Sequence, residues 1–214
     1  MRNLVAALAC RVTGTRLYGK PLQNLDYEKN ITVPDQLLDT LATVEEISTV
    51  ALAIAEGPEN FLFEKTAKNR GIPYVFGSEV DVLSRGLKCA YNTQATDIFF
   101  VTSECPFLWA EGIEEAWQNH INHENDATVV EGLPEGAAFE IYTTEALQTS
   151  YDKGNSWHRG EGWSRYIRTH RSDFKVEVIE PPRILARQDI RLTIDYPEDL
   201  VLCRHIFKHF RNDT

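Results

Sequence analysis

Three basic side chains lie in a glycine-containing loop near the start of the chain. Arg11, Arg16 and Lys20 follow a short apolar run from residue 4 to residue 10, which has the composition of a buried strand. Guanidinium and ammonium groups on a tight loop, aided by its backbone N–H groups, can hold and neutralise a polyphosphate. The residue types and their spacing therefore indicate a phosphate site at this loop.

The loop partly matches a P-loop. Residues 14–20 read G-T-R-L-Y-G-K, which satisfies most of the pattern G-x-x-x-x-G-K-[ST]. The next residue is Pro21, where a P-loop has a hydroxyl that holds Mg²⁺. Because proline supplies neither that oxygen nor a backbone N–H, a P-loop phosphotransferase is disfavoured. Such an enzyme would transfer a γ-phosphate and release no pyrophosphate.

A second interpretation fits the same loop better. Residues 8–22, L-A-C-R-V-T-G-T-R-L-Y-G-K-P-L, resemble the signature I-P-A-R-x-x-S-x-R-L-P-G-K-P-L of the CMP-KDO synthetases and SpsF-like cytidylyltransferases. Ala9, Gly14 and Tyr18 depart from the Pro, Ser and Pro of that signature. The alternative is a solvated glycine turn that happens to carry basic residues. The resemblance implies a loop that wraps the triphosphate of CTP.

A further stretch extends the implied nucleotide site. V-F-G-S-E-V-D-V-L-S-R at residues 75–85 resembles the SpsF-type V-F-R-G-S-E-x-D-V-L-x-R, which lies against the nucleotide, although the Arg after Phe is missing here. Asp81 could equally be a helix N-terminal residue that satisfies local donors. The resemblance implies Arg11, Arg16 and Lys20 as catalytic residues, and as nucleotide-binding residues Leu8, Ala9, Arg11, Lys20, Ser78, Asp81 and Arg85.

Two acids are implied as metal ligands. F-V-T-S-E-C-P-F-L at residues 100–108 resembles the family's I-x-A-D-C-P-L, in which a carboxylate at a strand end holds the metal, and the acid here is Glu104. R-L-T-I-D-Y-P-E-D at residues 191–199 matches R-L-T-V-D-T-P-E-D and implies Asp195 as the second carboxylate. Mg²⁺, or Mn²⁺, is the implied cofactor, since Mg²⁺ prefers oxygen ligands. Asp195 could instead cap a turn, and Glu104 is one methylene longer than the family's Asp.

Weaker correspondences imply an acceptor site. L-P-E-G-A-A-F-E at residues 133–140 resembles L-P-x-G-x-x-x-E, and G-E-G-W-S-R-Y-I at residues 160–167 resembles R-E-H-V-T-P-Y-I. These stretches imply Glu140, Glu161 and Tyr166 as acceptor-binding residues. The two acids could instead be solvated or form lid salt bridges.

The elements that must position these residues alternate between strand and helix. We expect strands at 4–10, 50–55, 74–76, 97–102, 127–130, 138–142, 175–179 and 191–194, and helices at 34–41, 59–68, 80–91, 114–120 and 198–210. This alternation favours an α/β fold, a single three-layer Rossmann-like domain over residues 1–214 with a mostly parallel sheet. Its ligands would lie beyond the carboxyl ends of the strands.

Residues 130–170 are expected to form an inserted lid or dimerisation arm. The part from 150 to 170 is rich in Trp, Gly and Arg, unlike a core element. Trp157 and Trp163 could stack on a base, but we expect them to pack across a dimer interface.

Histidine and cysteine spacing indicates no zinc site. His120 and His123, like His205 and His209, could share a helix face, but neither pair has a convincing third ligand, so exposed helix histidines are expected. The four cysteines are scattered without a C-x-x-C pair, which predicts buried free thiols.

Composition restricts the partners. The net charge of −10 repels nucleic acid and anionic membranes, so no nucleic-acid or membrane partner is expected. No apolar run approaches the roughly 20 residues of a membrane span, and Met1-Arg2-Asn3 leads into strand-like sequence without a cleavable signal pattern. We expect a cytoplasmic protein.

The resemblance as a whole implies a metal-dependent nucleotidyltransferase that forms a homodimer. It would transfer CMP from CTP to an acidic sugar or similar small acceptor and release pyrophosphate, in the synthesis of surface polysaccharide or glycoconjugate precursors. Two alternatives stay open: a nucleotide-binding homologue that has lost catalysis, and transfer to a sugar phosphate or phosphonate.

Overall fold

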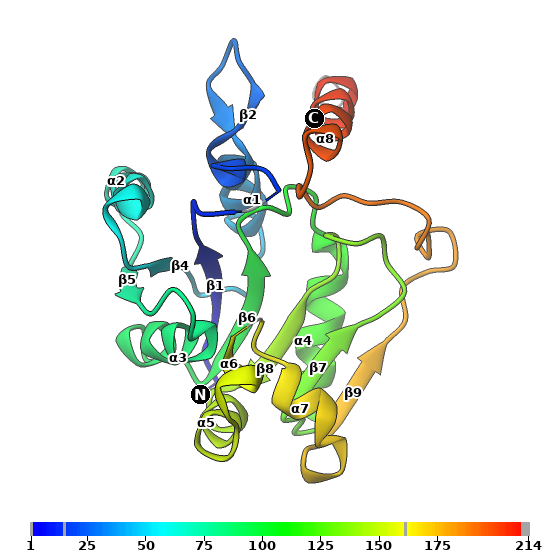
Figure 1. Ribbon diagram of the computed structural model, residues 1–214. Coiled ribbons are helices and arrows are strands. Elements are labelled where there is room, and N and C mark those ends of the chain that lie inside the picture. Colours follow the sequence, from blue (N-terminus) through cyan, green and yellow to red (C-terminus); the bar gives the residue numbers. More distant parts are fainter. Residues whose placement is uncertain (1, 15, 161, 211–214) are drawn as a thin grey trace.

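A central sheet organises the molecule in a computed structural model that describes residues 2–14, 16–160 and 162–210. Within these residues seven strands form the sheet, in the order β5-β4-β1-β6-β8-β7-β9 (Figure 1). β8 runs antiparallel to β6 and β7, and the other pairs are parallel. The strands are β1 (Leu4–Cys10), β4 (Thr49–Ala55), β5 (Tyr74–Gly77), β6 (Asp97–Thr102), β7 (Ala127–Val130), β8 (Glu140–Thr143) and β9 (Val176–Ile179).

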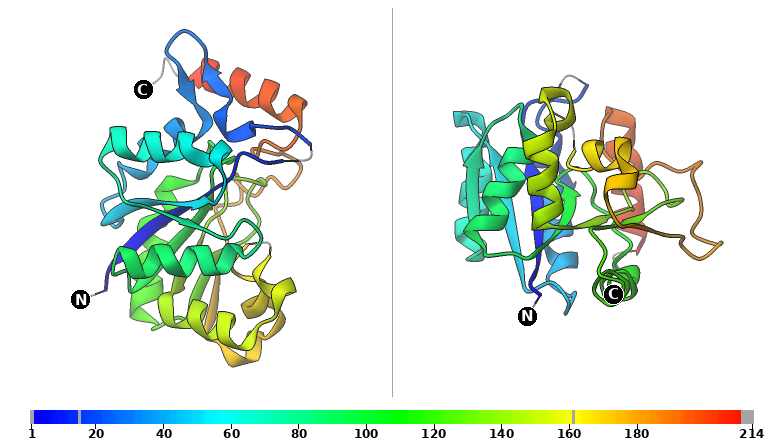
Figure 2. Two further views of the ribbon diagram at one scale, coloured as in Figure 1. Left: turned by 60° about the vertical axis from the view of Figure 1, so that its left-hand side comes forward. Right: turned by 90° about the horizontal axis from the view of Figure 1, so that it is seen from below.

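Helices cover both faces of the sheet and make three layers (Figure 2). One face carries α1 (Val33–Leu41), α2 (Phe61–Arg70) and α4 (Ile113–Asn122), and the other carries α3 (Val82–Asn92), α5 (Thr144–Lys153) and α7 (Arg165–Thr169). Shorter or separate elements are the hairpin β2 (Asn24–Asp26) and β3 (Ile31–Thr32), α6 (Ser156–Arg159), α8 (Pro197–Phe210), and the single 3₁₀ turns Lys20–Leu22, Pro58–Asn60, Ala110–Gly112 and Arg171–Asp173. The predicted three-layer α/β fold is confirmed.

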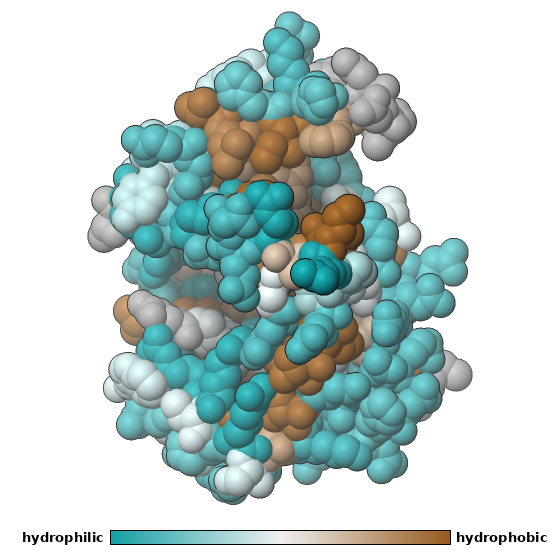
Figure 3. Space-filling view, turned by 90° about the vertical axis from the view of Figure 1, so that its right-hand side faces the viewer, coloured by the Kyte–Doolittle hydropathy of each residue, from teal (hydrophilic) through white to brown (hydrophobic). Residues whose placement is uncertain are grey.

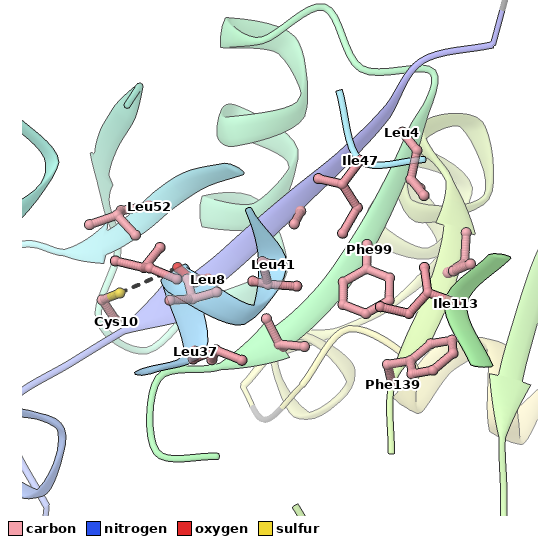
Figure 4. Close-up of a cluster of buried hydrophobic side chains, with 14 of the residues drawn as sticks. Leu4, Leu8, Cys10, Leu37, Leu41, Ile47, Leu52, Phe99, Ile113 and Phe139 are labelled. Carbon is pink, nitrogen blue, oxygen red and sulfur yellow. Dashed lines mark hydrogen bonds between the residues drawn. The ribbon is translucent and has the colours of Figure 1, made fainter. Parts of the chain in front are cut away.

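β1 is the central strand of this arrangement. It pairs in parallel with β4 and with β6, so both of its faces are covered, and this explains why its sequence is apolar without alternation. Leu8 packs with Leu37 of α1 and Phe99 of β6 in one core layer (Figure 4). The register of these strands brings their carboxyl ends to one edge of the sheet.

One predicted strand is wrong. Residues 191–194 form only an isolated bridge between Arg191 and Glu135. The Leu192 N–H donates to Glu135 O at 2.7 Å, whereas the Ile194 N–H donates to Glu104 O at 3.0 Å. Because its backbone hydrogen bonds go to two different loops, the segment joins no ladder. The segment lies just before α8, and its hydrogen bond to Glu104 connects it to the end of β6.

Part of the predicted arm belongs to the core. Trp163 is fully buried, its ring centroid lies 4.3 Å from that of Phe100, and its indole N–H donates to Val82 O at 3.0 Å. The expectation that Trp163 packs across a dimer interface is therefore wrong. Gly86 of α3 explains the burial, because a Cβ there would lie 2.5 Å from the Trp163 ring.

His120 also differs from its expected exposure. It is fully buried, with Nε2 3.1 Å from Asp97 Oδ1 and Nδ1 2.8 Å from Thr128 Oγ1. The sequence pattern failed here because a histidine can occupy a core position when both ring nitrogens find partners. His205 and His209 are exposed on α8, as expected.

The four cysteines are free, and three of them are buried. No helix within the described residues is long and apolar enough to cross a membrane. At the β9 edge of the sheet the surface is mostly hydrophilic, with separate hydrophobic areas (Figure 3). The half-exposed Val178 lies on this edge strand.

Candidate active site

A cavity of about 820 Å³ opens at the carboxyl ends of β1 and β6. Its volume lies in the upper part of the range for ligand sites, which is roughly 300–1,000 Å³. The described residues that line it come from the loop after β1, the end of β6, the start of α3 and the segment 156–165. This is the edge where ligands of open α/β sheets bind.

The loop after β1 is held in a defined shape. The Gly19 N–H donates to Val12 O at 3.1 Å, and the Val12 N–H donates to the buried side chain of Asn60 at 2.8 Å. Gly19 has φ +64°, a conformation that favours glycine. Lys20 then begins a single 3₁₀ turn rather than the α-helix of a P-loop.

Lys20 joins two acids that lie far apart in the sequence. Its Nζ is 2.8 Å from Asp195 Oδ1 and 3.2 Å from Glu104 Oε1. The loop after β1, the end of β6 and the segment before α8 meet at the carboxyl edge of the sheet (Figure 1). The structure thus brings the predicted catalytic residue Lys20 together with both predicted metal carboxylates.

Asp195 is surrounded by cations. Besides Lys20, Arg16 Nη2 lies 2.6 Å from its Oδ1 and Arg191 Nη2 lies 2.8 Å from its Oδ2. Burial would raise the pKa of the Asp195 carboxyl, but hydrogen bonds from Lys20 and Arg191 hold it below its ordinary value. Turn capping does not explain this side chain, because Asp199 accepts the backbone N–H groups of that turn.

Arg191 was missed in the sequence. Besides its contact with Asp195, it pairs with Glu135 and its Nε lies 3.5 Å from Asp199 Oδ1. The one available signal was an Arg four residues before an Asp, which points to an ion pair only if the segment is helical. Residues 191–195 are not helical, so the contact depends on a tertiary turn.

Of the other residues predicted to bind the nucleotide, some line the cavity and others lie in the core or shape a turn. Ala9 and Arg11 line the cavity, and Arg11 is exposed. Leu8 is fully buried in the core. Ser78 Oγ accepts the Asp81 N–H at 3.0 Å and therefore shapes the turn into α3.

Asp81 and Arg85 both line the cavity at the start of α3. Asp81 caps this helix by accepting the Ser84 N–H at 2.9 Å, as the alternative interpretation expected. Arg85 is only 2% exposed, and its Nη1 donates to Ser78 O at 2.9 Å. Its Nε finds no hydrogen-bond partner in the described part of the chain, and burial lowers the pKa of the guanidinium.

Two of the predicted acceptor residues, Glu140 and Tyr166, are not among the described residues that line this cavity. Glu140 pairs with Arg168 and accepts the Tyr142 hydroxyl. Tyr166 is buried, with its ring stacked on His170 at 4.0 Å between centroids. Glu161 lies outside the described residues.

The site offers the kind of ligand that a hard metal ion prefers, but it does not offer a complete set of protein ligands. Glu104 and Asp195 offer carboxylate oxygens, which are ligands that Mg²⁺ prefers. Within residues 2–14, 16–160 and 162–210 no group of three or more His, Cys, Asp or Glu side chains is placed to hold a metal. Phosphate oxygens and water would have to supply the other ligands.

A scan against models of known protein families finds no match. An uncharacterised protein of Methanocaldococcus jannaschii is 25% identical over 208 residues, covering 97% of this chain and 84% of that protein. The spore coat polysaccharide biosynthesis protein SpsF of Bacillus subtilis is 23% identical over 209 residues, covering 93% of this chain and 84% of SpsF.

Solved structures share the whole architecture. A cytidylyltransferase from Leptospira borgpetersenii superposes with a TM-score of 0.81 at 19% identity, covering 98% of this chain and 94% of that one. A CMP:2-keto-3-deoxy-manno-octonic acid synthetase complexed with CTP superposes with a TM-score of 0.72 at 11% identity, covering 97% and 99%. The chain is therefore similar in sequence to SpsF over most of its length and has the fold of the cytidylyltransferases.

Proposed function

We propose that this protein is a nucleotidyltransferase that transfers CMP from CTP to an acidic sugar or similar small acceptor and releases pyrophosphate. One observation carries the proposal: Lys20 and Glu104 line a cavity that has room for a nucleotide and an acceptor, and Lys20 contacts Asp195 there. The fold shared with a CMP-sugar-acid synthetase supports this choice of reaction. The role of SpsF in spore coat polysaccharide biosynthesis supports a place in polysaccharide precursor synthesis.

The chain's cations would bind and neutralise the triphosphate. Arg11 reaches the cavity from the end of β1, and Lys20 reaches it from the end of the loop. Lys20 would exchange its carboxylate partners for phosphate oxygens, while the ion pair between Arg191 and Asp195 would stay formed. Arg16 would assist from the rim, where its side chain is half exposed.

The reaction is an in-line displacement that depends on positioning and electrostatics. The acceptor oxygen forms a bond to the α-phosphorus of CTP, and the bond from that phosphorus to the bridging oxygen of pyrophosphate breaks. Glu104 and Asp195 would hold Mg²⁺, which supplies charge stabilisation on the phosphate oxygens when bound. Arg11 and Lys20 would stabilise the negative charge that builds up on the leaving pyrophosphate.

A screen of pyrophosphate release tests the proposal. Four nucleoside triphosphates are combined with sugar acids, sugar phosphates and phosphonates in the presence of Mg²⁺ or Mn²⁺. Release with CTP and one acceptor class, with the CMP adduct identified by mass, is the expected result. Release of γ-phosphate without pyrophosphate would contradict it.

The Asp195→Asn substitution tests the proposed metal carboxylate. It removes a charge that both the metal and the triphosphate cations would use, so pyrophosphate release should fall at least about 100-fold. The matched control is Asp189→Asn, an exposed acid that pairs with Arg187 outside the cavity lining. Unchanged release in the Asp195 variant would remove this residue from the mechanism.

Loss of catalysis is the second candidate. Glu104 has a longer side chain than the family's Asp, and its Oε1 is engaged by Lys20. Calorimetric binding of CTP without turnover of any acceptor in the screen would favour a nucleotide-binding homologue over an enzyme.

A further inference from the structure

Lys20 lies between the two carboxylates that are proposed to hold the metal. Its Nζ is 2.8 Å from Asp195 Oδ1 and 3.2 Å from Glu104 Oε1, and only 14% of its side chain is exposed. A divalent ion would use the same two side chains, because carboxylate oxygens are the protein ligands that Mg²⁺ prefers. The ammonium group and a metal ion therefore need the same acids.

The oxygen of Asp195 that faces Lys20 has no acceptor position left. Lys20 Nζ lies 2.8 Å from Oδ1 and Arg16 Nη2 lies 2.6 Å from it, whereas Arg191 Nη2 lies 2.8 Å from Oδ2. A carboxylate oxygen has about two acceptor positions. A metal ion that bridges Oδ1 and Glu104 must therefore displace one of the two cations on Oδ1.

Lys20 is the cation that such an ion would displace. Of the two cations on Oδ1, it is the one that also contacts Glu104 in the described part of the chain. Arg191 would stay in place, because Glu135 and Asp199 hold it as well. A half-buried ammonium that loses two carboxylates is destabilised unless another anion replaces them. Lys20 lines the cavity, where the phosphate oxygens of CTP can do so.

We propose that Lys20 is an internal cation that competes with a divalent metal ion for Glu104 and Asp195, so that metal and CTP each favour the binding of the other. A metal ion on the two carboxylates releases Lys20 for the triphosphate, and a triphosphate on Lys20 releases the carboxylates for the metal. Such coupling is reciprocal by thermodynamic necessity. This inference rests on the proposed CMP transfer and describes how ligand binding at that site is regulated.

Mn²⁺ binding without nucleotide tests the competition. Mn²⁺ is titrated into the protein, and the free ion is measured by electron paramagnetic resonance. Lys20→Met keeps the side-chain length and removes the ammonium group, so Mn²⁺ should bind this variant at least about 10-fold more tightly than the wild type, within the usual range of coupling. Equal or weaker binding to the variant, or no measurable binding to it, would overturn the proposal.

Two further variants separate competition from a general effect of charge. Arg11→Met removes one positive charge from the same cavity, but among the described residues Arg11 forms no ion pair with Glu104 or Asp195. It should change the Mn²⁺ affinity by less than about threefold, because its exposed charge is screened. The gain in Lys20→Met should disappear when Asp195→Asn is added. An equal gain in the Arg11 variant, or a gain that persists in the double variant, would contradict direct competition.

CTP binding in the presence of EDTA tests the reverse direction. Glu104→Gln removes one of the acids that compete with the triphosphate for Lys20, so the Kd of metal-free CTP should fall at least about fivefold, the lower end of typical coupling. In the Lys20→Met background the same substitution should change the Kd by less than about twofold, because no lysine remains to be released. A gain of equal size in both backgrounds would mean that charge alone acts, and the proposal would fail.

Turnover separates the two proposals. If Lys20→Met binds Mn²⁺ more tightly through Asp195 but the wild type releases no pyrophosphate with any acceptor, the competition stands and CMP transfer fails. If the wild type releases pyrophosphate from CTP and Lys20→Met does not bind Mn²⁺ more tightly, CMP transfer stands and the competition fails.

Discussion

Lys20 is the residue on which the proposed nucleotide site depends most directly. It is the one described cation that contacts both Glu104 and Asp195. The Lys20→Met substitution keeps the side-chain length and removes the charge. Since hydrogen bonds to charged groups contribute about 1.5–3 kcal/mol, the Kd of CTP should rise about 10- to 100-fold. Lys29→Met, in the exposed turn of the hairpin, should leave the Kd unchanged.

Isothermal titration calorimetry with CTP measures this effect. An unchanged Kd in the Lys20 variant would mean that the lysine serves only to neutralise the two carboxylates. The Lys20 variant should also have a lower free energy of unfolding, because Glu104 and Asp195 would then lie close together without the cation that contacts both.

Single residues divide into those whose role follows from a motif and those whose role follows from packing. The family-like stretches of the sequence indicated Lys20, Glu104 and Asp195 as site residues, and in the fold Lys20 contacts both acids. Arg159 was missed because it contacts Asp81 in a distant segment. Arg191 was missed because it reaches Asp195 through a non-helical turn and Glu135 in another loop. A local pattern contains no information on such turns.

At the scale of elements, α3 and the segment after α6 depend on each other. Gly86 lets the Trp163 ring lie directly against the helix, and an added Cβ would approach ring atoms to 2.5 Å. We expect Gly86→Ala to lower the free energy of unfolding by about 1–3 kcal/mol, the usual cost of overpacking. The ring would be displaced, and the part of the cavity wall that carries Trp157 and Arg159 would move with it.

Urea denaturation followed by tryptophan fluorescence measures both effects. The matched control is Gly160→Ala, because Gly160 has a helical backbone and a Cβ there would meet atoms no closer than 3.4 Å. That variant should be neutral or slightly more stable, since alanine restricts the unfolded chain. Equal stability of the Gly86 variant and the wild type would show that the segment repacks freely.

Elements were predictable where burial follows a regular pattern. The bounds of β1 and β6 agree with the apolar runs, because parallel strands buried on both faces have uninterrupted apolar sequence. Residues 191–194 are also at least partly buried. Their backbone hydrogen bonds, however, go to two loops and not to a neighbouring strand. Trp163 was expected at an interface, because an amphipathic ring gives no sign of whether its partner surface is in the same chain.

At the scale of the whole molecule, a buried polar network ties the sheet to α4 at the edge opposite the cavity. Asp97 is fully buried at the start of β6 and accepts hydrogen bonds from Arg2, at 2.9 Å from Nε, and from Thr96 at 2.7 Å. His120 of α4 contacts the same carboxylate and, through its other ring nitrogen, Thr128 of β7. The network joins two strands, a helix and the N-terminal segment.

This network makes the stability of the molecule depend on pH. Burial would raise the pKa of the Asp97 carboxyl, but hydrogen bonds from Arg2 and His120 hold it below its ordinary value. A lowered folded-state pKa means that the unfolded chain binds the proton first as the pH falls. The contribution of Asp97 is therefore complete above the unfolded value of about 3.9 and is lost as the pH falls below it towards the folded pKa.

The Asp97→Asn substitution should accordingly reduce the free energy of unfolding at pH 7 by about 3–5 kcal/mol, because it leaves the partly buried Arg2 and the buried His120 without their anion. The difference from the wild type should stay constant down to about pH 4 and shrink as the pH falls further, where the wild type loses the same contribution. Urea denaturation at several pH values measures it, with Asp152→Asn on the exposed side of α5 as control. A difference that does not shrink below about pH 4 would mean that Asp97 stabilises the fold by shape and hydrogen bonding rather than by its charge.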